Sequence, residues 1–485
     1  MRRANVGTIF RFWVPALVLV TGCAAHRAAP VTAPSGPKPV DAPAALAATW
    51  DAEHVSPPLP PLVRHADLVQ WLAELSRRWP DLFAVEEIGR SVEGRSINHV
   101  TFGHGPFHVL LWSQMHGDEP SATCALFDVF EFVRGHRSEP AVQRMLDALA
   151  VHAVPMLNPD GAERFQRRNA QGIDINRDAL LQQTPEGRAL KALRDRLNPP
   201  LGFNLHNQDW RTSAAKTGQP ASISLLSVAF DEARSLNPGR LRTKRVCATI
   251  RDALEPLAPG RIAKYDDEFE VRAFGDNITK WGTSVVLIET GGWPGEGADA
   301  ALVRLNFVAL VASLEAVATG NVDRADPRRY DSLPMNGESV FYQLVRHATI
   351  VPGTGVAPFT GDIGLTVNRS VQSVNGERQM RVTTRINDLG DLRVFGALET
   401  IEAEGLIVAP LFDPALKAGD ETQLPDWKGW TGNTIATGRP GDLLLLRPSG
   451  PGTFRVERIL RGDAIAGTTR MTTDESPRPT PPVVR

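Results

Sequence analysis

The sequence predicts an α/β protein with a mixed central sheet that carries helices on both faces, followed by a small all-β domain. Two observations support this prediction. Between residues 61 and 322, short apolar runs typical of buried strands alternate with segments of helical periodicity. From about residue 335 to 470 the chain is rich in Val, Thr and Gly, in short alternating runs such as QMRVTTRI and TFRVERIL. The length of 485 residues also favours more than one domain.

The N-terminus has the features of an export signal. Arg2 and Arg3 precede an apolar run, residues 12–20, that is too short to cross a bilayer as a lasting helix. The run ends in Val-Thr-Gly-Cys, and small residues before a cysteine resemble a bacterial lipobox. We therefore expect residues 1–22 to be a lipoprotein signal peptide and Cys23 to be lipidated. An ordinary signal peptide with an incidental cysteine is the alternative.

Localisation and the next segment follow from this expectation. Ala24 stands where an Asp would indicate retention in the inner membrane, so we expect a lipid-anchored protein in the outer membrane that faces the periplasm. Residues 23–60 are mostly Ala, Pro and Val and are predicted to be a linker.

The other two cysteines, Cys124 and Cys247, are too few for a disulfide framework, and we expect both to be free and buried.

The catalytic region is predicted to span residues 61–322, and its elements follow one another in a regular alternation. Leu68, Leu72 and Leu75 have helical spacing, and that helix ends at a turn around Pro80. Strands are then expected at residues 97–103, 107–114, 151–157, 203–208 and 284–292, with helices at 121–135 and 301–320.

The region after a polar joint is predicted to be a separate β domain over residues 335–470, followed by a disordered tail over 471–485. Residues 344–355, 361–364 and 402–410 weakly resemble the small β domain of amidohydrolases. In those enzymes a metal-binding His-x-His follows directly, whereas here residues 411–414 read LFDP. We therefore expect a non-catalytic β module that binds substrate or a partner.

A group of metal-binding residue types stands at the ends of predicted strands. His116 and Glu119 lie three residues apart where an apolar strand gives way to a helix, so they can point to the same place. His206 ends a second strand and Glu289 ends a third. Open sheets place their crevices at such carboxyl ends. A single His-x-x-Glu pair is weak evidence, because most such pairs are surface residues.

Five motifs in this order make residues 60–320 resemble the zinc carboxypeptidase family, the M14 peptidases. They are HGDE at 116–119, NPDG at 158–161, the run RRNAQGIDINRD at 167–178, NLHN at 204–207 and LIETGG at 287–292. The resemblance implies one Zn²⁺ per chain, a catalytic carboxylate and a pair of residues that bind the terminal carboxylate of a peptide. By position it assigns the metal to His116, Glu119 and His206, catalysis to Glu289 and Arg167, and substrate binding to Asn176, Arg177 and Tyr265.

Two of these assignments have rivals in the sequence. Arg168 is adjacent to Arg167 and competes for the role of polarising the scissile carbonyl. Tyr265 precedes Glu289 as a tyrosine does in many family members, but its surroundings are unusual and it is equally well a core residue.

Three protein ligands leave a position open for water, which is typical of catalytic rather than structural zinc. The sequence therefore predicts a zinc metallocarboxypeptidase that cleaves C-terminal amide bonds of peptides or cell-wall peptide fragments, with water activated by Glu289. The alternatives are a zinc amidase or deacylase and, less consistent with the intact motif set, an inactive binding protein.

His-Glu-His also admits Co²⁺ or Mn²⁺. The formal net charge of −2 argues against a nucleic-acid partner.

Four acidic residues before the catalytic carboxylate leave a further choice open. Asp266, Asp267, Glu268 and Glu270 are interpreted either as a solvated loop or as a pocket that selects a basic or amine-bearing group.

Overall fold

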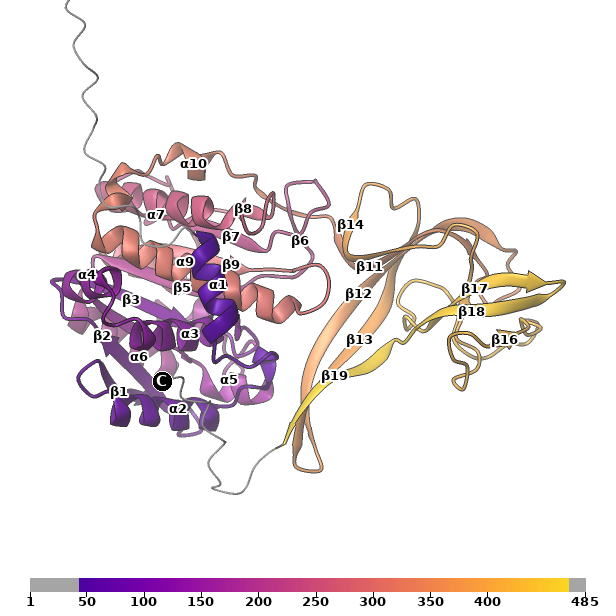
Figure 1. Ribbon diagram of the computed structural model, residues 1–485, viewed down its shortest axis with the longest axis horizontal. Helices are drawn as coiled ribbons and strands as arrows, with labels where there is room; N and C mark the ends of the chain where they lie inside the picture. The colour runs from indigo at the N-terminus through magenta and orange to yellow at the C-terminus, as the bar shows by residue number, and fades with distance from the viewer. Residues whose placement is uncertain (1–42, 471–485) are drawn as a thin grey trace, which may run out of the picture. The chain divides into compact units, whose positions relative to one another are not determined.

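The computed structural model describes residues 43–470 and contains an eight-stranded mixed sheet. The predicted signal peptide, Cys23 and the predicted tail at 471–485 lie outside these residues. The strand order is β1-β2-β4-β3-β5-β9-β7-β8 (Figure 1). The strands are β1 (Phe83–Arg90), β2 (Ser96–Phe102), β3 (Phe107–Ser113), β4 (Leu149–Val154), β5 (Leu201–Asn207), β7 (Ile223–Ser227), β8 (Ile262–Lys264) and β9 (Ser284–Thr290).

The four central strands of this sheet run parallel, and the antiparallel pairs lie toward its two edges. The parallel neighbours are β4, β3, β5 and β9, in this order. On one side β2 pairs antiparallel with both β1 and β4, and on the other side β7 pairs antiparallel with β9. The parallel centre places the carboxyl ends of β3, β5 and β9 at one edge of the sheet. The predicted mixed sheet is therefore confirmed.

Helices cover both faces, because the central strands are apolar on both sides. Val109 and Leu111 of β3 belong to one hydrophobic core, and Leu110 and Trp112 belong to another on the opposite face. Side chains of α1, α2, α3, α4, α7 and α9 contribute to the first core, and side chains of α6 and α8 to the second. These helices are α1 (Pro43–Glu53), α2 (His65–Arg78), α3 (Ser121–Gly135), α4 (Pro140–Ala148), α6 (Pro185–Leu197), α7 (Pro238–Leu254), α8 (Phe274–Lys280) and α9 (Ala298–Ala318).

Within residues 43–470, α9 is the one helix whose length and composition would let it cross a membrane. Most of it is buried inside the protein, where Val303, Phe307 and Leu310 belong to the first core. Cys124 and Cys247 are free and buried, as expected.

The predicted linker over residues 23–60 is wrong in its second half. Residues 43–53 form helix α1, which buries Leu46, Ala47 and Trp50. The Trp50 indole N–H donates to Oδ2 of Asp128 in α3 at 2.6 Å. The helix is stabilised because it buries three apolar side chains on one face and gives the indole a hydrogen-bond partner. The Ala- and Pro-rich composition did not indicate this burial.

The C-terminal region forms a nine-stranded sheet of the all-β kind that the sequence predicts (Figure 1). Its order is β16-β18-β17-β15-β11-β12-β13-β19, and β14 also pairs with β11. The strands are β11 (Val340–Ile350), β12 (Phe359–Val374), β13 (Glu377–Gly390), β14 (Gly396–Glu402), β15 (Ile407–Pro410), β16 (Glu421–Thr422), β17 (Leu443–Gly450), β18 (Thr453–Leu460) and β19 (Asp463–Arg470).

Short elements connect these parts. They are α5 (Pro159–Arg164), α10 (Arg328–Asp331), three 3₁₀ turns, η1 (Pro60–Leu62), η2 (Ile175–Arg177) and η3 (Asn321–Arg324), and the short strand pair β6 (Thr212–Ala214) and β10 (Asn336–Glu338).

Candidate metal centre

The turn between β3 and α3 carries the first two candidate ligands, His116 and Glu119. It starts at Gln114, whose φ of 49° lies in the left-handed region, and the backbone N–H of Glu119 closes it by donating to the carbonyl of His116. Gly117 packs directly on Gly161, so that a Cβ atom at position 117 would lie 2.0 Å from the Gly161 carbonyl carbon. The HGDE motif therefore needs its glycine because two backbones meet here, and the NPDG motif needs its glycine because a Cβ atom at position 161 would overlap the Asn158 side chain.

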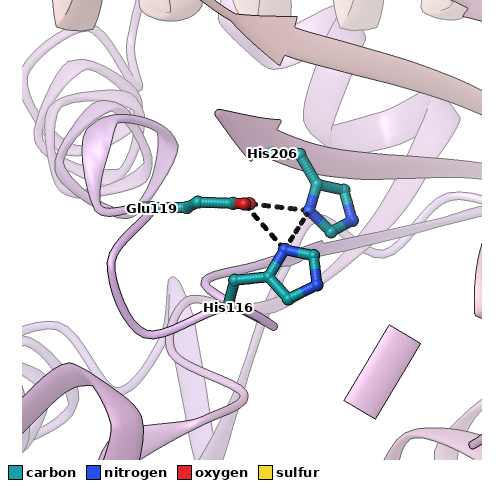
Figure 2. A group of neighbouring side chains, drawn as sticks. All are labelled: His116, Glu119 and His206. Atoms are coloured by element: carbon teal, nitrogen blue, oxygen red, sulfur yellow. Dashed lines mark hydrogen bonds and ion pairs between the residues drawn. The ribbon is translucent and has the colours of Figure 1, made fainter. Parts of the chain in front are cut away.

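The third candidate ligand and the candidate base lie side by side on neighbouring parallel strands. His206 near the end of β5 is the register partner of Glu289 near the end of β9. Figure 2 shows His206, His116 and Glu119 converging on one point. Glu119 Oε1 lies 2.7 Å from His116 Nδ1 and its Oε2 lies 2.7 Å from His206 Nδ1, while the two Nδ1 atoms are 3.1 Å apart.

This donor set fits a metal ion. All three side chains are buried, and one ligand atom from each lies within 4.8 Å of the others. His116 Nε2 lies 3.1 Å from Asp174 Oδ1, so its proton belongs on Nε2 and the Nδ1 lone pair faces Glu119 and His206. Two imidazole nitrogens and a carboxylate are ligands that Zn²⁺ accepts.

The electrostatics of the cluster favour a positive charge at the same point. Burial lowers the pKa of His116, but the charge of Glu119 and the hydrogen bond to Asp174 outweigh burial and raise the pKa to about 9. Burial raises the pKa of Glu119, yet the two histidines hold it well below its usual range. The carboxylates thus attract a cation, and a metal ion can take the place of the proton.

Glu289 is a buried carboxylate whose Oε2 has no hydrogen-bond partner in the described part of the chain. Burial raises its pKa well above the ordinary value, and the nearby charge of Glu119 raises it further. A carboxylate with high proton affinity next to candidate metal ligands has the properties of a general base.

The structure places Arg167, and not Arg168, at the cluster. Arg167 donates through Nε to Asp174 Oδ2 at 3.0 Å, and its Nη1 lies 3.1 Å from His116 Nδ1. Arg168 instead donates to the carbonyl of Gly172. Arg167 is therefore the arginine that can stabilise negative charge beside the metal position.

The 3₁₀ turn η2 carries Asn176 and Arg177. The Oδ1 atom of Asp174 accepts from the backbone N–H of Asn176, and Oδ1 of Asn176 accepts from the backbone N–H of Phe274 at 2.9 Å. Arg177 Nε lies 3.3 Å from Glu270 Oε2. Its side chain lines a pocket of about 420 Å³ together with Arg168, Gly172, Ile173, Asp174 and Arg272. Arg177 is thus presented to a cavity, where a carboxylate could meet it.

Tyr265 lies within electrostatic reach of the cluster. The charge of Glu289, followed by burial, raises its pKa to about 12. The side chain also packs against the second hydrophobic core. Tyr265 thus lies near the site and also contacts the core. Its environment agrees in part with a substrate-binding residue and in part with a core residue.

Asp174 is the site residue that the sequence did not single out. Its carboxylate contacts His116 and Arg167 and caps the turn that presents Arg177. In the sequence it stands within the run at 167–178 with no role assigned to it. Its position two residues before Asn176 was the available signal, because an Asp there caps η2.

Comparisons with known proteins agree with this arrangement. Residues 68–216 match the family described as zinc carboxypeptidase. Carboxypeptidase E of Caenorhabditis elegans is 30% identical over 134 residues, which are 23% of this chain and 28% of that protein. The human carboxypeptidase N catalytic chain is 31% identical over 137 residues, which are 24% of this chain and 30% of that protein. The chain thus spans less than a third of the length of these relatives.

A crystal structure of a metallo-carboxypeptidase from Burkholderia cenocepacia aligns with 53% of this chain and 69% of its own, at 18% identity and a TM-score of 0.43. The region that matches the family model contains His116, Glu119, His206 and Arg167, whereas Glu289 and Tyr265 lie beyond it. Residues 68–216 are thus similar to the zinc carboxypeptidase family, M14.

Proposed function

We propose that this chain is a zinc-dependent metallocarboxypeptidase-like hydrolase that removes C-terminal residues from peptides or cell-wall peptide fragments. The observation that carries the proposal is the convergence of His116, Glu119 and His206, with Glu289 on the strand beside His206. The match of residues 68–216 to the zinc carboxypeptidase family supports it.

The roles of the residues follow from their positions. When bound to the three ligands, Zn²⁺ supplies Lewis-acid chemistry that lowers the pKa of water to about 7. Glu289 accepts the proton of the attacking water and passes it to the departing amine nitrogen. Arg167 stabilises the negative charge that develops on the carbonyl oxygen. Arg177 binds the terminal carboxylate with a bidentate guanidinium, and Asn176 assists it.

The proposal is tested by incubating the purified, zinc-loaded chain with a mixed peptide pool and identifying the released amino acids by mass spectrometry. We expect single C-terminal residues to appear. Glu289→Gln should lower the rate roughly 10²- to 10⁴-fold, because it removes the general base. The metal content of this variant should equal that of the wild type, since Glu289 is not among the three ligands. Undiminished hydrolysis by Glu289→Gln would contradict the assignment.

The amidase or deacylase alternative makes a different prediction about Arg177. A hydrolase that reads a terminal carboxylate loses most of its kcat/KM when Arg177 becomes Gln, and C-terminal amidation of the peptide costs the wild type a similar amount. An amidase that acts on substrates without this carboxylate is insensitive to both changes. Measuring both substrates with both proteins separates the two activities.

We propose in addition that the chain is exported and lipid-anchored through Cys23 in the outer membrane, facing the periplasm. The Val-Thr-Gly-Cys sequence supports this proposal. The test is labelling with radioactive palmitate in a bacterial host, followed by separation of the inner and outer membranes on a sucrose gradient. We expect label in the wild type and none in Cys23→Ser. Label absent from both proteins would favour an ordinary signal peptide.

A further inference from the structure

The pocket beside Arg177 has an unusual charge. Three of its six lining residues are arginines, namely Arg168, Arg177 and Arg272, and Asp174 is its one carboxylate. Asp174 is already engaged, because its two oxygens contact His116 and Arg167. The pocket therefore presents more guanidinium groups than the acid in its lining can neutralise.

A substrate with a single anionic group would need only one of the arginines in this pocket. Arg167 faces the metal position, and Arg177 suffices for one terminal carboxylate. Arg168 and Arg272 remain on the pocket wall. Arg272 shares Glu270 with Arg177 through contacts of 3.3 to 3.4 Å, and Arg168 donates to the carbonyl of Gly172. Both side chains have further N–H donors for a ligand.

The acidic residues near the pocket do not convert it into a site for a basic group. Asp267 pairs with Arg234 and Arg240, and Glu270 pairs with Arg177 and Arg272. Asp266 and Glu268 are exposed, and neither lines the pocket. Thus two of the four acids already have cationic partners, and the other two face solvent. The sequence-based interpretation of a pocket for basic groups loses its support here.

We infer that this pocket selects substrates whose C-terminal residue carries a second anionic group, such as a peptide ending in Glu or Asp. The inference rests on the proposed function, because it assigns the terminal carboxylate to Arg177. Arg272 and Arg168 then bind the side-chain carboxylate and act as specificity-determining residues. The contacts of Arg272 with Glu270 are long, so an incoming carboxylate can compete for this guanidinium.

Binding and turnover are measured separately to test the inference. Acetylated tripeptides with free C-termini, Ac-Ala-Ala-Glu, Ac-Ala-Ala-Leu and Ac-Ala-Ala-Lys, are titrated by calorimetry into zinc-loaded Glu289→Gln protein. The Glu-ended peptide should bind roughly tenfold or more tightly than the Leu-ended one, because it gains a charge-assisted hydrogen bond. The Lys-ended peptide should bind most weakly of the three.

Two variants locate the preference. Arg272→Gln and, independently, Arg168→Gln in the same background should weaken the preference, so that the ratio of the Glu-ended to the Leu-ended Kd rises toward one. Arg393→Gln is the matched control, because Arg393 is exposed and, like Arg272, bonds the acid two residues before it, Asp391. This control should leave the ratio unchanged. Melting temperatures show whether each variant is folded.

Equal affinity for the Glu- and Leu-ended peptides, tightest binding of the Lys-ended peptide, or binding of none of the three would overturn the inference. Turnover by the wild type tests the proposed function independently. Release of Leu as fast as Glu would uphold hydrolysis and overturn the inference. Selective binding of the Glu-ended peptide without any release would uphold the inference and contradict the proposed function.

Discussion

At the scale of single residues, Asp174 connects three parts of the site. It accepts from His116 Nε2, pairs with Arg167, and caps the turn that holds Arg177. A carboxylate behind a ligating histidine fixes its tautomer and raises its basicity. The carboxylate therefore affects metal affinity although it is not itself among the candidate ligands.

The change Asp174→Asn should weaken zinc binding roughly 10- to 100-fold, because the amide keeps the size of the side chain but removes its charge. Zinc affinity is measured by competition with a chromophoric chelator. Asp391→Asn, at an exposed acid that also pairs with an arginine, is the control and should keep wild-type affinity. An unchanged affinity in Asp174→Asn would show that the His116 tautomer does not depend on this contact.

The sequence identified those residues whose role can be inferred from a motif. His116, Glu119 and His206 stand in family order at strand ends, and the structure brings them together. The sequence could not choose between Arg167 and Arg168, because adjacent residues differ only in the direction of their side chains. Asp174 has no assigned role in the motif run at 167–178, and only the folded loop brings it to His116 and Arg167.

At the scale of elements, three neighbouring strands carry a chain of hydrogen-bonded histidines. His152 of β4 lies 3.0 Å from His99 of β2 through Nδ1 and 2.9 Å from His108 of β3 through Nε2. The chain ends at Glu86 of β1, which lies 2.8 Å from His99 Nδ1. Burial, followed by the charges of His99 and His108, lowers the pKa of His152 to about 3, and burial also lowers that of His99. The folded state therefore holds the rings of His152 and His99 neutral.

The histidine chain should make the fold sensitive to acid. The unfolded chain binds a proton at His152 near its ordinary pKa of about 6.5, whereas the folded chain does so only near 3, so stability falls as the pH drops from 6.5 toward 3. One such group costs about 1 kcal/mol between pH 6.5 and 5.5.

Urea unfolding of the zinc-loaded protein at these two pH values should show a larger loss for the wild type than for His152→Gln. Gln can donate and accept hydrogen bonds but does not titrate, so the difference between the two losses isolates the ring of His152. Equal losses would contradict a neutral His152 in the folded state.

Helix α1 depends on one buried carboxylate. Asp128 accepts from the Trp50 indole, from the backbone N–H groups of Val55 and Ser56, and from the Ser56 hydroxyl. Asp128→Asn replaces one accepting oxygen by a donor and should lower stability by about 1 to 3 kcal/mol. It should also speed chymotryptic cleavage after Trp50.

Asp81→Asn, at an exposed acid of the same fold, is the control and should change neither property. Cleavage after Trp50 at the wild-type rate in Asp128→Asn would mean that other contacts hold α1. The sequence pointed to a linker here because Ala and Pro dominate it, and the partner of Trp50 lies 78 positions further along the chain.

At the scale of the whole molecule, the two sheets differ in how well the sequence predicts them. The parallel centre of the first sheet follows from apolar runs joined by helices, since crossovers of that length favour parallel pairing. The antiparallel insertion of β7 beside β9, and the pairing of β6 with β10 across more than a hundred residues, carry no local signal. The contacts of the second sheet with residues of the first domain, such as Pro61 and Ala162, likewise carry no local signal.

One residue that makes such contacts is Arg378, near the turn between β12 and β13. Its side chain is buried and donates to the carbonyls of Ala162 and Pro61 at 2.8 and 3.3 Å, and it also lies 3.3 Å from Glu163. Ala162 belongs to α5, which contains the last three residues of the NPDG motif and ends shortly before Arg167. A residue of the β domain thus supports a segment next to the candidate metal centre.

The change Arg378→Met should therefore lower the free energy of unfolding by about 1 to 3 kcal/mol, because it removes a buried donor to two carbonyls and the cationic partner of Glu163. Arg378→Lys, which keeps the charge, should recover part of that loss. The matched control is Arg381→Met, three residues along the same strand, where the arginine makes an exposed pair with Asp463. An exposed pair adds little to stability, so the urea midpoint of the control should stay close to that of the wild type. If Arg378→Met moves the midpoint no further than Arg381→Met, the β domain does not stabilise α5 through this residue.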